Sequence, residues 1–226
     1  MATWKPYRIS DIVTDIDEEK FVLPVIQRSL VWTEEKMELL YDTVLKGNSF
    51  GGIMVIDEDK ESKPLFSYRP FTKDGNFIES KEAEKLRQQQ SFVIDGQQRL
   101  QSFYIGLKGS INGKELYFDL FSDYNSLFEF KFEKNEKDLP KTSKEIEDRV
   151  ITKYFWYPVK ELLRMLKDTD DEEIVADEII SNNDIEEKNE KDHIGKNIKA
   201  FYKNIISSES KEKHGYFTIS EEDKDF

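Results

Sequence analysis

Residues 91–107 read SFVIDGQQRLQSFYIGL, and this stretch predicts a strand, a tight turn and a helix in direct succession. Ser91–Ile94 suits a buried strand, and Asp95-Gly96 is typical of a turn. The first amides of a helix have no acceptor within it, and the helix dipole adds partial positive charge there, so the stretch predicts an anion-binding turn. Apolar side chains recur at helical spacing after the turn, at Leu100, Phe103, Tyr104 and Leu107.

Arg99 breaks the charge preference of this helix end. A cation in the first helical turn opposes the dipole, whereas a bound phosphate would make it favourable because a guanidinium binds phosphate through paired hydrogen bonds. Asp95 is expected to fix the turn and is the candidate for holding a metal-bound water. The alternative is an ordinary turn, in which Asp95 caps the helix, Gly96 supplies an unusual backbone angle, and Gln97 and Gln98 face solvent.

A second polar cluster lies at another strand-to-helix junction. Gln27 and Arg28 follow the predicted strand Phe21–Leu23 and precede a helix that we expect to begin after Thr33. Two Gln-Arg pairs at such junctions would place two cations near one end of a sheet. On the residues alone, an anion pocket and a pair of ordinary turns are then about equally supported.

Trp32 and the Gly51-Gly52 pair each have a functional and a structural interpretation. Trp32 stacks on a nucleobase or packs against the helix that follows it, and the packing role is favoured. The glycines let a backbone approach phosphate or begin a strand, and the strand is narrowly favoured. His193 and His214 are expected at the surface, without a chemical role.

Composition narrows the classes of function. The chain has no cysteine and two histidines, which excludes disulfides, thiolate metal sites and a cysteine nucleophile, and leaves little for a histidine metal site or a Ser-His-Asp triad. No signal-peptide segment is recognisable, and no apolar run approaches the ~18 residues of a membrane span. We therefore expect a cytoplasmic protein with no membrane partner and no side-chain metal site.

The net charge of −13 is concentrated in one segment. Residues 168–192 hold 12 acidic and two basic side chains and so account for −10 of it. This segment is either a solvated helix face or a connector. The acidity does not exclude an anionic ligand elsewhere, whereas the lack of a basic footprint argues against nucleic-acid binding by this chain alone.

The hydrophobic pattern predicts an α+β fold in two parts. Residues 1–135 carry a mixed sheet with helices, interrupted by a polar insertion at about residues 58–90 in which Lys81–Gln89 is expected to be a surface helix. Residues 136–226 form a mostly helical acidic extension that includes a strand at Tyr216–Ile219. We expect this extension to be incomplete at its C-terminus.

Phe21–Trp32, Phe50–Asp57 and Asp95–Leu100 together resemble the N-terminal domain of the domain of unknown function 262 family. That family includes the GmrSD-type modification-dependent restriction enzymes and the phosphorothioate-sensing SspE proteins. Its hallmark is an Asp-Gly-Gln-Gln-Arg motif, which Asp95–Arg99 matches at every position. The resemblance implies a ParB/sulfiredoxin-like fold and the binding of a nucleoside triphosphate (GTP, CTP or ATP, together with Mg²⁺), whose hydrolysis regulates DNA cleavage in restriction and phage defence.

The resemblance also implies roles for individual residues, with Asp95 and Arg99 as the catalytic ones. Hydrolysis at these two residues is a weaker expectation than nucleotide binding, because no residue stands out as a general base. The expected partners are a nucleotide and, through a larger assembly or a further domain, DNA. An oligomer is compatible with the sequence. No nuclease motif is recognisable in these residues. Two alternatives stay open: a non-catalytic DNA-interaction module, and a scaffold whose acidic segment binds a basic partner. The residues expected to bind the nucleotide are Gln27, Arg28, Gly96, Gln97, Gln98 and Arg99.

Overall fold

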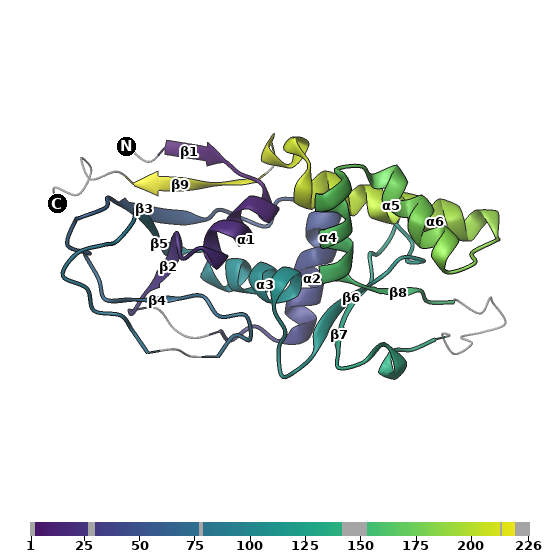
Figure 1. Cartoon of the computed structure of the whole chain (residues 1–226), viewed down its shortest axis with the longest axis horizontal. Coiled ribbons are helices and arrows are strands. Elements are labelled where there is room, and N and C mark those ends of the chain that lie inside the picture. Colours follow the sequence, from purple (N-terminus) through teal and green to yellow (C-terminus); the bar gives the residue numbers. More distant parts are fainter. Residues whose placement is uncertain (1–2, 27–29, 77–78, 142–152, 213, 220–226) are drawn as a thin grey trace.

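The computed structural model describes residues 3–26, 30–76, 79–141, 153–212 and 214–219. These residues form helices, a six-stranded mixed sheet and a smaller three-stranded sheet, which confirms the expected α+β class (Figure 1). The ParB-like topology stays a prediction. The strands are β1 Thr3–Pro6, β2 Phe21–Pro24, β3 Met54–Glu58, β4 Tyr68–Pro70, β5 Gln90–Asp95, β6 Glu115–Asp119, β7 Phe130–Glu133, β8 Trp156–Pro158 and β9 Gly215–Ile219.

The strand of the Asp95–Arg99 motif lies inside the six-stranded sheet. The strand order is β1-β9-β3-β5-β2-β4, in which β3 with β9 and β2 with β5 are parallel and the other neighbours are antiparallel. The three-stranded sheet is antiparallel, with the order β7-β6-β8. Because β9 lies between β1 and β3, segments from both ends of the chain complete the larger sheet.

The helices connect the two sheets. One hydrophobic core runs from the larger sheet across the helices into the smaller sheet, where Phe118 stacks on Phe130 at 4.4 Å between ring centroids. Phe128, Phe130 and Phe132 are all buried in this core. The α-helices are α1 Ile9–Asp17, α2 Glu34–Leu45, α3 Gln97–Lys108, α4 Val159–Thr169, α5 Glu172–Asn182 and α6 Lys188–Phe201. A π-helical segment, Tyr202–Ile206, continues α6, and short 3₁₀ helices lie at Glu136–Asp138 and Ser208–Glu212.

The insertion covers part of the opposite face of the larger sheet, and the predicted helix over Lys81–Gln89 is wrong. The backbone of Lys81 instead pairs with Tyr68, and Leu86 is buried against the sheet in a small cluster. Tertiary pairing therefore overrides the helix propensity of this polar stretch. The cluster consists of Val22, Tyr68, Leu86 and Phe92.

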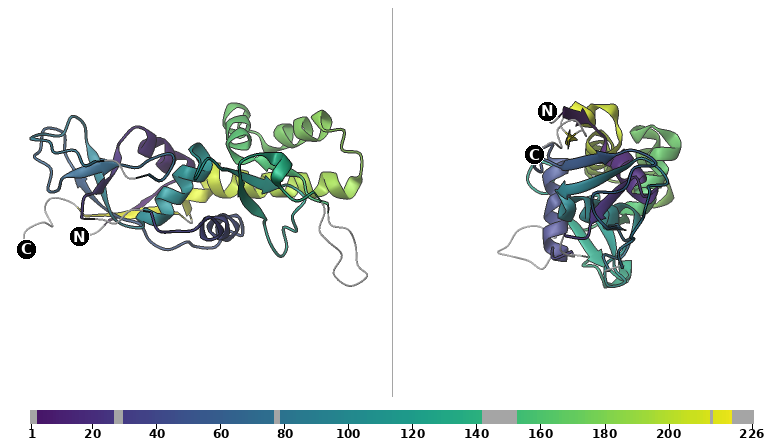
Figure 2. Two further views of the ribbon diagram at one scale, coloured as in Figure 1. Left: turned by 90° about the horizontal axis from the view of Figure 1, so that it is seen from below. Right: turned by 90° about the vertical axis from the view of Figure 1, so that its left-hand side faces the viewer.

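The extension contains the expected helices, α4 to α6, and the expected strand at its end, β9. α5 and α6 lie toward the end of the elongated molecule that is far from the larger sheet (Figure 2). The division into domains at residue 135 stays a prediction. Among the described helices, none combines the length and apolar character that crossing a membrane requires.

Candidate functional site

The Asp95–Arg99 motif spans the junction between β5 and α3, as expected: Asp95 ends the strand, Gly96 makes the turn, and the helix begins at Gln97. Gly96 has a φ of +86°, and a Cβ there would lie 3.0 Å from Ile53 Cγ1 and 3.3 Å from Ile53 Cα. Glycine is therefore required both by the backbone angle and by the close approach of Ile53. The Gly96 carbonyl accepts the N–H groups of Arg99 and Leu100, so α3 begins directly after the strand.

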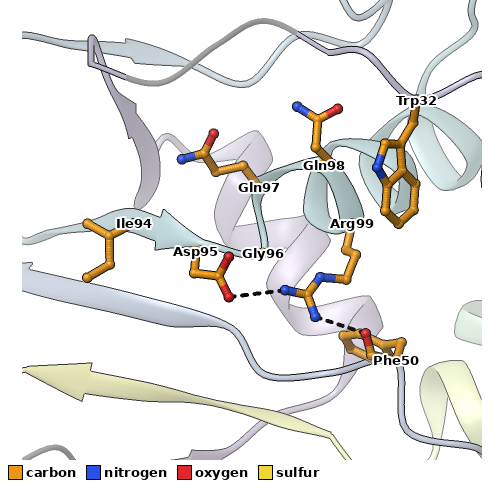
Figure 3. Close-up of a pocket in the computed structure, with 8 residues that line it drawn as sticks. All are labelled: Trp32, Phe50, Ile94, Asp95, Gly96, Gln97, Gln98 and Arg99. Carbon is orange, nitrogen blue, oxygen red and sulfur yellow. Dashed lines mark hydrogen bonds and ion pairs between the residues drawn. The ribbon is translucent and has the colours of Figure 1, made fainter.

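A pocket of about 420 Å³ opens at this turn (Figure 3). The turn supplies most of the lining, and two aromatic residues from the loops around α2 supply the rest. Because α3 begins here, the helix end that was predicted to bind an anion borders a cavity. We call this cavity the motif pocket; its lining residues are Trp32, Phe50, Ile94, Asp95, Gly96, Gln97, Gln98 and Arg99.

The Arg99 side chain is held within the wall of the motif pocket. Its Nη1 donates to the Phe50 carbonyl at 2.9 Å, and its Nη2 lies 3.3 Å from Oδ2 of Asp95 (Figure 3). The Arg99 side chain is 17% exposed, whereas that of Asp95 is 71% exposed. The guanidinium is thus fixed in direction, and the carboxylate that pairs with it faces solvent.

Gly51 makes room for this guanidinium. Gly51 has a φ of +95°, and a Cβ at this position would overlap Nη1 of Arg99. A side chain would therefore both strain the backbone and displace Arg99. The glycine pair was expected to begin a strand or to admit phosphate; the structure shows that Gly51 accommodates the arginine of the motif.

The two glutamines of the motif point away from Arg99 (Figure 3). Gln97 is buried and its Nε2 donates to the Val93 carbonyl at 3.1 Å. Oε1 of Gln98 accepts the N–H of Val31 at 2.8 Å. Gln97 therefore braces its own strand, and Gln98 ties the loop before α2 to the motif.

The loop before α2 was expected to supply the other side of the site. β2 and β5 are parallel neighbours, so the segments after Pro24 and after Asp95 leave the same edge of the sheet. Gln27 and Arg28 lie outside the residues that the structure describes. Trp32 lines the motif pocket and packs against the hydrophobic core, and the ammonium of Lys36, on the helix that follows it, lies 5.2 Å from its ring centroid.

Two residues near Arg99 were not anticipated. Phe50 provides the carbonyl that Arg99 binds, and the aromatic residue before a glycine pair is the sequence signal that could have found it. His214 was expected at the surface but is 2% exposed, with its ring 4.9 Å from that of Phe50. The prediction of an exposed His214 was wrong because β9 joins the larger sheet, and this places His214, the residue before β9, under the loop around Phe50.

Comparison with known proteins identifies the family of the chain. The family model described as GmrSD restriction endonuclease, N-terminal domain, matches residues 9–225. This match confirms the resemblance to GmrSD-type N-terminal domains and extends it through α4 to α6 and β9. No curated protein matches the chain.

Proposed function

The chain belongs to the family of GmrSD restriction endonuclease N-terminal domains, and we propose that it is the nucleotide-binding regulatory module of a DNA restriction or phage-defence system. The observation that carries this proposal is Arg99, a cation in the first turn of α3 that borders a cavity of about 420 Å³. A cation at this end of a helix is unfavourable by itself and favourable beside a bound phosphate.

The motif pocket offers three kinds of donor to phosphate oxygens. The first amides of α3 carry the positive end of the helix dipole. The guanidinium of Arg99 has further N–H groups besides the two that contact Phe50 and Asp95. Gln97 and Gln98 would add neutral donors by turning their side-chain amides toward the ligand, away from the contacts with Val93 and Val31 that they make in this structure. Gln27 and Arg28 would close the other side of the site.

Hydrolysis of the bound nucleotide is the second part of the proposal. Water would add to the terminal phosphorus, the bond to the bridging oxygen would break, and the products would be a nucleoside diphosphate and phosphate. Asp95 is exposed and borders the pocket, so its carboxylate fits a Mg²⁺ ion held mainly by phosphates and water. Asp95 would hold metal-bound water, and Arg99 would stabilise the charge that develops on the phosphoryl group.

Titration calorimetry with GTP, CTP and ATP, with and without Mg²⁺, tests the proposal. We expect saturable binding of at least one triphosphate, and we expect Arg99→Ala to weaken it at least about tenfold because a charge-assisted phosphate contact is lost. Arg164→Ala is the matched control, since Arg164 is an exposed arginine on α4 that pairs with Glu161 and Asp168.

Two outcomes would contradict the proposal. One is the failure of all three triphosphates to bind a wild-type chain that is folded by circular dichroism. The other is binding of duplex DNA alone with a steep salt dependence, which would replace the nucleotide-binding module by a DNA-interaction module.

A further inference from the structure

A row of exposed apolar side chains crosses the part of the larger sheet that the insertion leaves open. Trp4 on β1 is the register partner of Phe217 on β9, which is also the partner of Met54 on β3. These three side chains are 38–41% exposed. Met54 is in turn the register partner of Asp95, so the row ends beside the motif.

Next to this row lies a second pocket, of about 320 Å³, which we call the aromatic pocket. Trp4 and Phe217 form one wall, with ring centroids 4.8 Å apart, and Phe50 and His214 form another, with ring centroids 4.9 Å apart. Gly215 lies beneath the indole, because a Cβ there would be 2.5 Å from Cζ2 of Trp4. The pocket thus presents aromatic rings on two sides of a glycine.

The aromatic pocket adjoins the motif pocket. Phe50 lines both pockets, and Gly51, which lines the aromatic pocket, is the residue that accommodates the Arg99 guanidinium. Neighbouring strands lie about 4.8 Å apart, so Phe217, two strands from Asp95, is roughly 10 Å from the motif. A ligand with an anionic end and a flat apolar end, joined by a short spacer, could therefore occupy both pockets.

We propose that the aromatic pocket receives the base of the nucleotide whose phosphates occupy the motif pocket, an inference that rests on the proposed function. Every nucleobase has a flat π-face that stacks on aromatic side chains, and the sugar separates that base from the phosphates. Four of the eight residues that line the motif pocket are polar or charged, whereas the aromatic pocket is lined by four rings, three glycines and one serine. The two pockets therefore divide the phosphates and the base between them.

Gly52 allows the aromatic pocket to be blocked without disturbing Arg99. It lines the pocket, its φ lies outside the left-handed region, and a Cβ there would have no atom of the described residues within 4 Å. Gly52→Leu would therefore fill the pocket rather than strain the fold. Gly195→Leu on α6 is the matched control, because within the described part of the chain a Cβ at Gly195 also has no atom within 4 Å.

The test compares two ligands by calorimetry: whichever of GTP, CTP and ATP binds the wild type most tightly, and inorganic tripolyphosphate, which has no base. We expect Gly52→Leu to weaken nucleotide binding about tenfold or more, because the leucine fills the pocket and the base can no longer stack there. Phe217→Leu should weaken nucleotide binding several-fold, because stacking on its ring is lost. Tripolyphosphate should bind both variants and the Gly195→Leu control as it binds the wild type.

Three results would overturn the inference, and each identifies what failed. If the nucleotide binds both variants as it binds the wild type while Arg99→Ala still weakens it, the phosphate site holds and the base lies elsewhere; Trp32→Leu would then show whether it lies in the motif pocket. If Gly52→Leu lowers the affinity for the nucleotide and for tripolyphosphate equally, the substitution disturbs Arg99 and there is no separate base site. If neither ligand binds the wild type, the proposed function itself fails.

Discussion

The Arg99 guanidinium is held by the Asp95 carboxylate on one side and by the Phe50 carbonyl on another, in space that the missing side chain of Gly51 leaves free. An arginine fixed in this way loses less conformational freedom when it binds a ligand, because its rotamer is already selected. At the scale of single residues, the site therefore depends on a glycine distant in sequence from the motif as well as on the motif itself.

Gly51→Ala tests this dependence. We expect the alanine Cβ to displace the guanidinium and to weaken nucleotide binding about tenfold, in addition to a loss of stability of roughly 1–3 kcal/mol from the left-handed backbone. Gly113→Ala is the control, since Gly113 has a φ of +75° but a Cβ there meets no atom within 4 Å among the residues that the structure describes. Calorimetry and urea unfolding of both variants should show similar losses of stability, with loss of binding in Gly51→Ala alone; equal binding by both would contradict the role of Gly51.

At the scale of elements, α3 carries the motif and is positioned by its packing against α2. Tyr41 on α2 is fully buried, and its hydroxyl donates to the Phe103 carbonyl on α3 at 3.2 Å. Gly106 lets the two helices approach, because a Cβ there would overlap that hydroxyl and lie 2.9 Å from Cδ2 of Leu116. The glycine is thus a packing requirement within a helix that would otherwise favour alanine.

Glycine-to-alanine substitutions in α3 and α6 should accordingly change the free energy of unfolding in opposite directions. Gly195→Ala on α6 has open space and should raise the free energy of unfolding by about 0.5–1 kcal/mol through helix propensity. Gly106→Ala should lower it by about 1–3 kcal/mol, because overpacking outweighs the same gain. Chemical denaturation measures both, and a stabilising Gly106→Ala would show that α2 and α3 are not in close contact.

The elements around the motif could be predicted from the sequence because local signals decide them. The turn at Asp95-Gly96, the apolar face of α3 and the strand of β9 each follow from spacing and turn chemistry. The contacts that shape the site could not be predicted in this way. Phe50 lies 49 positions from Arg99, His214 is buried only because β9 joins the sheet, and the stretch around Leu86 packs instead of forming a helix.

At the scale of the whole molecule, Asp57 joins segments from both ends of the chain. Its carboxylate accepts hydrogen bonds from Lys5 on β1 at 2.8 Å, Thr218 on β9 at 2.7 Å and Ser91 on β5 at 2.6 Å. Burial raises the pKa of Asp57, but these three donors lower it more, so that it lies below its usual value of 3.8. The ionised carboxylate thus stabilises the sheet that carries the motif.

This network predicts a pH dependence of stability. Because the pKa of Asp57 is lower in the folded state, its contribution is complete above pH 3.8 and is lost as the pH falls through the folded-state pKa. We expect Asp57→Asn to lower the free energy of unfolding by about 1–3 kcal/mol at pH 7, and the difference from wild type to shrink in acid. Urea unfolding of the variant and the wild type, at pH 7 and in acid, measures this difference in free energy, and Asp59→Asn, at an exposed aspartate, is the control. A difference between Asp57→Asn and wild type that does not change with pH would contradict the network.

Phosphate binding in the motif pocket is tested most directly by an NMR titration of the ¹⁵N-labelled chain with the nucleoside triphosphate that it binds best. If the phosphates occupy the motif pocket, the largest shifts should fall on the backbone amides of Gly96, Gln97 and Gln98 and on the Nε–H of Arg99, and inorganic tripolyphosphate should move the same signals. Saturation that leaves these signals unchanged and moves others would show that the nucleotide binds elsewhere and would contradict the assignment of the motif pocket.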